Sequence, residues 1–255
     1  RDMYAVYTDE ELRTLEERAI ALYDGTTRAI IGNFGMGSFG DIAYVPGTQI
    51  PFPKGIRAVA DWYMATKLYP DYVMGIFQRQ LEIALENLAL YRQAVGERIA
   101  AIFISGTDFG SQRGAFIAPA SYRAMFQPFH KAINDWVHAN TSWKTFYHSC
   151  GSMVDLYDDF IAAGVDIVNP VQISAAGMDP ATLKARWGDR LVFWGAGVDT
   201  QRVLPFGTPD EIREHVRQNV AILGVGGGFV FNSIHNIQAG IPTENLVALF
   251  EAFSA

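Results

Sequence analysis

The sequence predicts an α/β fold built on parallel strands. Short apolar runs with strand character alternate with amphipathic helical patterns along the chain, and no hairpin turn signal joins any two of the runs. Parallel neighbours require crossover helices, which this alternation supplies. The length of 255 residues and a hydrophobic fraction of 49% suffice for one large α/β domain. We therefore expect a single domain over residues 1–255.

The N-terminal part of the chain contains clear helix signals. A capping box at Thr8-Asp-Glu-Glu11 predicts the start of a helix, and Gly25 predicts its end. A short buried strand is expected over residues 28–34. Glycine and proline are frequent over residues 35–55, which predicts a long loop. Helical patterns then fill residues 59–95, with a break near Tyr69-Pro70.

From residue 101 the alternation of strand and helix patterns becomes regular. Strands are expected over residues 101–105, 145–148, 166–169, 191–195 and 228–232. The helices expected between and after them cover residues 119–139, 152–164, 179–187, 208–224 and 244–253, with Ser152 capping the second. Six strands in all fit an open doubly wound sheet, or a (β/α)8 barrel whose first two strands are missing from this chain.

Composition and charge exclude several classes of protein. The net charge of −7 argues against nucleic acid as a partner. Cys150, as the single cysteine, allows no internal disulfide, so we expect a reducing cytoplasmic environment. No apolar run of membrane-spanning length and no signal peptide pattern occur, so no membrane association is expected. The chain begins at Arg1 and passes almost directly into a helix, so we expect a segment upstream.

Polar side chains follow almost every predicted strand. The carboxyl ends of parallel strands meet at one edge of the sheet, which is where α/β folds carry out chemistry. We therefore expect the candidate site at these positions: Asp108, His148, Cys150, Asn169, Gln172, Asp199, Asn232 and His235.

The strongest chemical signal is the pair His148 and Cys150. Residues two apart on an extended segment point to the same side, and an imidazole beside a thiolate suits Zn²⁺. His235 is the best-placed third ligand, and three protein ligands leave a fourth position open for substrate. Two other interpretations stay open. The pair could be a buried histidine beside a chance cysteine, or His148 could activate Cys150 as a nucleophile, although such neighbours seldom form a productive hydrogen bond.

Two glycine motifs resemble phosphate-binding loops without their context. The run Gly35-Met-Gly-Ser-Phe-Gly40 fits G-x-G-x-x-G, but prolines occupy the space where a helix must follow, so we predict a loop. The run Gly224-Val-Gly-Gly-Gly228 precedes its strand and predicts a helix stop and turn. The long loop also carries aromatic residues that could cover a flat ligand, although packing of the loop is favoured: Phe39, Tyr44 and Phe52.

Several segments together resemble the uroporphyrinogen decarboxylase (URO-D) superfamily. They are Tyr147-His-Ser-Cys-Gly151, Asp166-Ile-Val-Asn169, Leu191-Val-Phe-Trp-Gly-Ala-Gly197, Gly228-Phe-Val-Phe-Asn-Ser-Ile-His235 and Pro242-Thr-Glu-Asn245. The resemblance covers nearly the whole chain. It implies a (β/α)8 TIM barrel of the URO-D type, of which this chain lacks the first two strands.

The resemblance also implies an activity. One branch of the superfamily holds zinc methyltransferases, which move methyl groups between a corrinoid (cobalamin) on a partner protein and a thiol or a methylated small molecule. Their H-x-C motif matches His148 and Cys150. Their next ligand is usually a cysteine where this chain has His235, and some relatives have an acidic ligand where it has Gln172. The resemblance implies zinc on His148, Cys150 and His235.

Further roles follow from the same resemblance. Asp108 and Asn232, with His235, would orient the substrate or move protons, and Asn169, Gln172 and Asp199 would bind the cofactor. The other branch is uroporphyrinogen decarboxylase itself, which converts uroporphyrinogen III to coproporphyrinogen III without a cofactor and is often a homodimer. A third possibility is a binding protein on a barrel scaffold that has lost catalysis. We favour methyl transfer.

Overall fold

The computed structural model describes residues 4–41, 56 and 58–254 and divides the chain into two compact units. The first unit comprises Arg1–Asp108, Ala120–Tyr147 and Ala162–Val165, and the second comprises Phe109–Pro119, His148–Ile161 and Asp166–Ala255. The single domain expected from the sequence stays a prediction.

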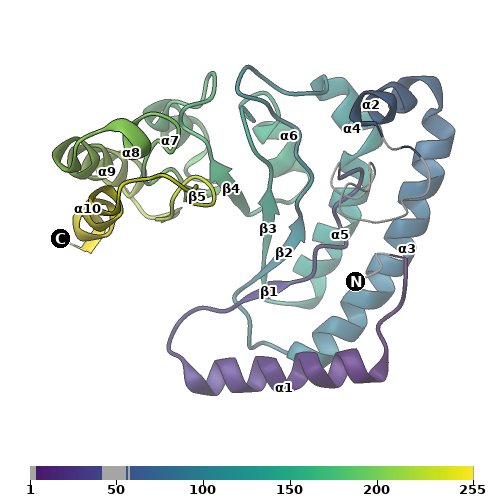
Figure 1. The fold of residues 1–255 in the computed structure, drawn as a ribbon. Helices are drawn as coiled ribbons and strands as arrows, with labels where there is room; N and C mark the ends of the chain where they lie inside the picture. The colour runs from purple at the N-terminus through teal and green to yellow at the C-terminus, as the bar shows by residue number, and fades with distance from the viewer. Residues whose placement is uncertain (1–3, 42–55, 57, 255) are drawn as a thin grey trace. The chain divides into compact units, whose positions relative to one another are not determined.

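Helices and strands alternate along the whole chain (Figure 1). In chain order the elements are α1 (Asp9–Gly25), β1 (Ile31–Asn33), α2 (Val59–Leu68), α3 (Pro70–Val95), β2 (Ala101–Ser105), α4 (Pro119–Met125), α5 (Gln127–Asn140), β3 (Lys144–His148), α6 (Tyr157–Ala162), β4 (Ile167–Val171), α7 (Pro180–Trp187), β5 (Val192–Gly195), α8 (Val203–Phe206), α9 (Pro209–Leu223), β6 (Phe229–Val230) and α10 (Thr243–Ser254).

The strands pair in parallel and in chain order. In the first unit β2 lies between β1 and β3, with Ile31 opposite Ala101. In the second unit β5 lies between β4 and β6. Ser149, which directly follows β3, donates its backbone N–H to the carbonyl of Asn169 in β4 (2.7 Å). The order β1 to β6 has no reversal, which excludes the doubly wound alternative and confirms the arrangement of a partial (β/α)8 barrel.

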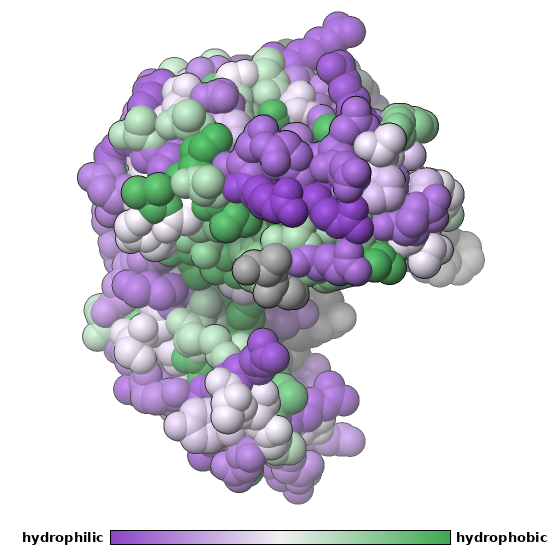
Figure 2. All heavy atoms as spheres, turned by 90° about the vertical axis from the view of Figure 1, so that its left-hand side faces the viewer, coloured by the Kyte–Doolittle hydropathy of each residue, from purple (hydrophilic) through white to green (hydrophobic). Residues whose placement is uncertain are grey.

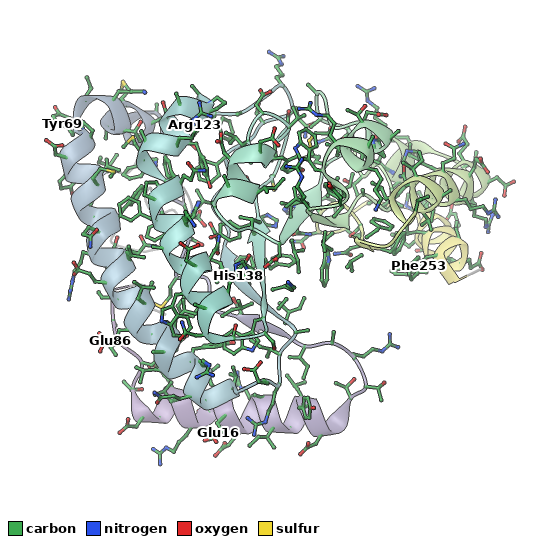
Figure 3. All side chains as sticks on the ribbon, turned by 180° about the vertical axis from the view of Figure 1, so that it is seen from behind. Glu16, Tyr69, Glu86, Arg123, His138 and Phe253 are labelled. Atoms are coloured by element: carbon green, nitrogen blue, oxygen red, sulfur yellow. The ribbon has the colours of Figure 1, made fainter. Side chains whose placement is uncertain are left out.

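The first unit is built around the long helix α3. Its buried residues recur at spacings of three and four, which is the pattern of a helix with one apolar face: Val73, Phe77, Gln80, Ile83, Ala84, Asn87, Leu88, Tyr91, Ala94 and Val95. Figure 3 shows exposed residues elsewhere on the helix, with Tyr69 at its start and Glu86 further along. Four phenylalanine rings from different elements pack together in the core: Phe39, Phe77, Phe126 and Phe129.

The second unit packs its last helices over a small aliphatic core. α9 begins with the predicted capping box of Thr208 and Glu211 and lies beside α10 (Figure 1). The residues buried between α8, α9 and α10 are Val198, Leu204, Ile212, Val216, Ala248 and Leu249. Figure 2 shows hydrophobic residues interspersed with hydrophilic ones at the surface. Such scattered exposure is ordinary for a folded protein.

Some boundaries differ from the prediction. α6 begins at Tyr157 and not after Ser152, because the Ser152 hydroxyl donates to the carbonyl of Ala176 (2.6 Å) and does not cap a helix. The helix expected over 119–139 is two helices that meet at Phe126. Pro128 lies in the first turn of α5, where its missing N–H costs nothing, and would have broken a continuous helix.

Both glycine motifs have the predicted structure where they are described. Residues 34–41 form turns with no helix, and Phe39 is fully buried, so packing is confirmed for that residue. Tyr44 and Phe52 lie outside the described residues. Gly224 ends α9, and positive φ angles at Gly226 and Gly228 form the turn into β6. Of the helices in residues 4–41 and 58–254, none combines the length and apolar character that a bilayer crossing requires.

Candidate metal centre

Three side chains from the second unit form a compact cluster. His148 ends β3, Cys150 lies two residues later, and His235 follows β6. One ligand atom from each lies within 4.8 Å of the other two. Cys150 Sγ lies 3.4 Å from His148 Nε2, and the two imidazole rings are 5.9 Å apart between centroids. The structure thus brings together the three residues that the sequence predicted as metal ligands.

Asn169 determines which tautomer of the neutral His148 ring is present. Its Nδ2 donates to the backbone carbonyl of Trp194 (3.2 Å), so its Oδ1 is the atom that faces His148 Nδ1, at 2.7 Å. An amide oxygen only accepts hydrogen bonds, so Nδ1 must carry the imidazole proton. In the neutral imidazole the lone pair is then on Nε2, the nitrogen that faces Cys150. A ligating histidine commonly has its other nitrogen held by an outer partner in this way.

The backbone around Cys150 is held by neighbouring loops. Gln172 Oε1 accepts from the N–H of Gly151 (2.8 Å), and Ser152 donates its N–H to Ser111 (2.8 Å). Gly151 has φ +85°, and a Cβ placed on it would lie 2.5 Å from the carbonyl carbon of Gly110. Only glycine fits this close approach of two chain segments. The loop that carries the thiol is therefore fixed in place and not free to move away from His148.

The cluster fits a tetrahedral Zn²⁺. Bonds of about 2.0–2.3 Å place the ligand atoms of such a site about 3.3–3.8 Å apart. The separation of 3.4 Å between Sγ and Nε2 falls in this range, whereas the limit of 4.8 Å for the set that includes His235 exceeds it, so His235 would move inward on binding the metal. His148 and Cys150 are half-buried and His235 is exposed, so the fourth side of the site opens outward. Imidazole nitrogen and thiolate sulfur are both ordinary zinc ligands, and three protein ligands leave one position of a tetrahedron open.

The other predicted site residues have different surroundings. Asp199 accepts from the backbone N–H groups of Gln201 and Arg202 (2.7 and 3.2 Å) and so caps the turn before α8. Asn232 is exposed and accepts a backbone hydrogen bond from Gly197 (2.9 Å). Neither is among the three clustered ligands, and their catalytic and cofactor-binding roles stay predictions.

Asp108 belongs to the first unit. Its backbone carbonyl accepts a hydrogen bond from the hydroxyl of Tyr63 (3.5 Å). Burial, followed by the nearby charges of Asp108 and Asp41, raises the pKa of Tyr63 to about 12. This phenol therefore stays protonated at neutral pH and acts as a hydrogen-bond donor toward the loop after β2.

A cavity of about 210 Å³ adjoins His235 and was not predicted. Its walls come from the ends of β4, β5 and β6, and its lining residues are Gln172, Thr200, Gln201, Ile234, His235, Asn236, Gln238 and Ile241. The rule that placed the site at strand ends applies to these residues too. Only Gln172 and His235 were singled out, because neutral side chains carry no metal-ligand or acid–base signature.

The geometry bears on the alternatives left open by the sequence. Cys150 Sγ lies at hydrogen-bond distance from His148 Nε2, so a thiolate–imidazole pair is compatible with the structure, and Cys150 as a nucleophile stays an alternative. A chance buried pair would not account for His235 approaching both residues, nor for the second bond of Asn169 to Trp194. The arrangement is one in which three side chains could hold a metal ion, with Asn169 as an outer hydrogen-bonded residue.

Comparisons with known proteins agree with this fold. The family model described as uroporphyrinogen decarboxylase (URO-D) matches residues 56–255. A uroporphyrinogen decarboxylase from Psychromonas ingrahamii is 41% identical over 68 residues, which cover 27% of this chain and only 18% of that protein. A methyltransferase from Methanosarcina mazei has a similar structure, with a TM-score of 0.64 and 19% identity, over 98% of this chain and 68% of the other.

Proposed function

Because the chain belongs to the uroporphyrinogen decarboxylase (URO-D) family, we propose that it is a zinc-dependent methyltransferase of that superfamily. It would move a methyl group between a corrinoid on a partner protein and a thiol or a methylated small molecule. The observation that carries the proposal is the cluster of His148, Cys150 and His235, whose ligand atoms lie within 4.8 Å of one another. The fold shared with a methyltransferase from Methanosarcina mazei supports it.

The residues in and around the cluster have separate proposed roles. His148 Nε2, Cys150 Sγ and one nitrogen of His235 would hold the metal, and Asn169 favours the tautomer in which Nδ1 of the neutral ring carries the proton. Zinc bound there would supply Lewis acidity, which lowers the pKa of a thiol or polarises a substrate oxygen. Gln172 holds Gly151 and hence the loop that bears Cys150.

The reaction itself balances without an added oxidant or reductant. A thiolate supplies the electron pair for a new bond to the methyl carbon of methylcobalamin, and the pair of the broken bond stays on cobalt. In the other direction, cob(I)alamin supplies the pair and the heteroatom that loses the methyl group takes up a proton. His235 is the exposed member of the cluster, so it lies where a substrate approaches from solution.

Decarboxylation of uroporphyrinogen is the second candidate. The curated relative from Psychromonas ingrahamii favours it, with 41% identity over the matched segment. Its substrate carries many carboxylates and requires several cationic side chains. The reaction uses no metal, and the cluster of three candidate metal ligands, His148, Cys150 and His235, would have no such role in it. We therefore place methyl transfer first.

The test is a pair of assays on the purified chain supplied with zinc. We expect it to transfer the methyl group of methylcobalamin to 2-mercaptoethanol, followed by the change in corrinoid absorbance, and to release no CO₂ from uroporphyrinogen III. His148→Ala should lose the transfer. His215→Ala is the matched control, since His215 lies in the same unit and bonds to Asn219 (3.0 Å), away from the cluster. Decarboxylation without methyl transfer would overturn the proposal.

A further inference from the structure

The cavity beside His235 has an unusual lining for a ligand site, because it combines hydrogen-bonding groups with no fixed charge. Five of its residues carry an amide or a hydroxyl group: Gln172, Thr200, Gln201, Asn236 and Gln238. Two more are isoleucines, Ile234 and Ile241, and the last is His235. Amides and hydroxyls both donate and accept hydrogen bonds, so this lining favours a polar but uncharged ligand.

The volume of the cavity limits the size of that ligand. Cavities for drug-sized molecules measure about 300–1,000 Å³, whereas this one measures about 210 Å³. A tetrapyrrole or a corrinoid is far too large for it. A methylated compound of a few heavy atoms fits, with its methyl group against the isoleucines and its oxygen toward the amides.

Gln172 has one end available for that oxygen. Its Oε1 is held by the N–H of Gly151 (2.8 Å), which directs the opposite end of the amide, the Nε2 donor, away from the loop of Cys150. Gln172 is nine-tenths buried and lines the same cavity as His235. A substrate oxygen bound by this amide would therefore lie in the cavity that His235 shares with the metal cluster.

Resting on the proposed function, we propose that this cavity binds the methylated substrate and that the substrate is a small neutral oxygen compound, such as a methyl ether. Among the side chains of the lining, a carboxylate would meet no arginine or lysine, and an ammonium group would meet no carboxylate and no phenyl, phenol or indole ring. Each would lose hydration without a compensating partner.

Three probes of nearly equal shape test the charge preference. They are 2-methoxyethanol, methoxyacetate and 2-methoxyethylammonium, and their dissociation constants are measured by saturation-transfer NMR on the zinc-free His148→Ala variant, in which no metal can bind the carboxylate. We expect 2-methoxyethanol to bind at least tenfold more tightly than either ion. Equal or tighter binding of methoxyacetate or of the ammonium compound would overturn the assignment of substrate class.

Charge variants test the location. Gln201 is exposed and lines the cavity, so Gln201→Glu should shift the preference toward the ammonium probe and Gln201→Lys toward methoxyacetate. Gln218→Glu and Gln218→Lys are matched controls on exposed α9 and should leave the preference unchanged. An unaltered preference in the Gln201 variants would overturn the cavity as the binding site.

The zinc-free variant His148→Ala separates this proposal from the proposed function. His148 does not line the cavity, so binding of 2-methoxyethanol should persist while methyl transfer is lost. Methyl transfer by the zinc-loaded wild type, together with no neutral preference in the zinc-free variant, would overturn only the substrate class. Wild-type protein that takes up no zinc would overturn the proposed function, and the substrate role of the cavity with it.

Discussion

Asn169 offers the sharpest test of how the metal site is organised. Asn169→Ala removes the acceptor 2.7 Å from His148 Nδ1 and the donor to Trp194. The imidazole then has no partner that keeps the proton on Nδ1, and its ring is free to turn. Loss of such an outer residue weakens metal binding about 10–100-fold, which corresponds to about 1.4–2.7 kcal/mol.

Zinc affinity and global stability must be measured separately. Competition against a chromophoric zinc chelator gives the first, and urea unfolding of the zinc-free protein gives the second. The alanine variant also loses two ordinary hydrogen bonds, which should lower the free energy of unfolding by about 1–3 kcal/mol. Asn219→Ala is the control, since Asn219 also contacts a histidine, His215, and a backbone carbonyl, that of Gly197, through its Nδ2 and outside the cluster.

A conservative variant distinguishes positioning from simple packing. Asn169→Asp keeps an oxygen acceptor for His148 Nδ1 but places a second oxygen against the Trp194 carbonyl. We expect zinc affinity close to that of the wild type together with reduced stability. Zinc affinity that stays unchanged in Asn169→Ala, within about twofold, would refute the argument that Asn169 holds the His148 ring with its proton on Nδ1.

The remaining predictions concern the surrounding fold. Gly151→Ala should lower the free energy of unfolding by about 3 kcal/mol or more, because its Cβ would meet Gly110 at a positive φ. The control Gly226→Ala has φ +70° in open space and should lower it by about 1–2 kcal/mol. Equal losses in the two variants would contradict the close approach of Gly151 to Gly110. Burial lowers the pKa of His130 from 6.5 to about 3. Below pH 6.5 the unfolded chain therefore binds a proton that the folded chain does not, and the free energy of unfolding decreases as the pH is lowered. The free energy of unfolding should fall by about 2–3 kcal/mol between pH 6.5 and 4.5. This fall should be absent in His130→Gln and retained in the exposed control His138→Gln. If unfolding free energy depended on pH in the same way in His130→Gln as in the wild type, His130 would be excluded as the cause.

The order of helices and strands was largely predictable because the sequence patterns that specify them are local. The capping boxes at Thr8 and Thr208 depend on side chains three residues apart, and both are present in the structure. The start of α6 was missed because the Ser152 hydroxyl bonds to Ala176, a partner remote in sequence. A capping residue and a serine with a tertiary partner look alike in sequence.

The clustering of the three candidate metal ligands was predictable for a similar reason, whereas the residues that hold them in place were not. His148 and Cys150 share a side by strand geometry, and His235 follows a strand end. The role of Asn169 depends on which end of its amide faces Trp194, which no sequence pattern specifies. The meeting of Gly110 and Gly151 joins two loops through backbone alone and leaves no signature beyond glycine itself.

Metal content tests the central claim most directly. The measurement is the zinc content of natively purified protein by elemental analysis, with His148→Ala as the variant and His215→Ala as the matched control. The cluster of His148, Cys150 and His235 predicts close to one zinc per chain in the wild type and in His215→Ala, and its loss in His148→Ala. Folded wild-type protein that contains no zinc and takes none up on dialysis against the metal would contradict the account.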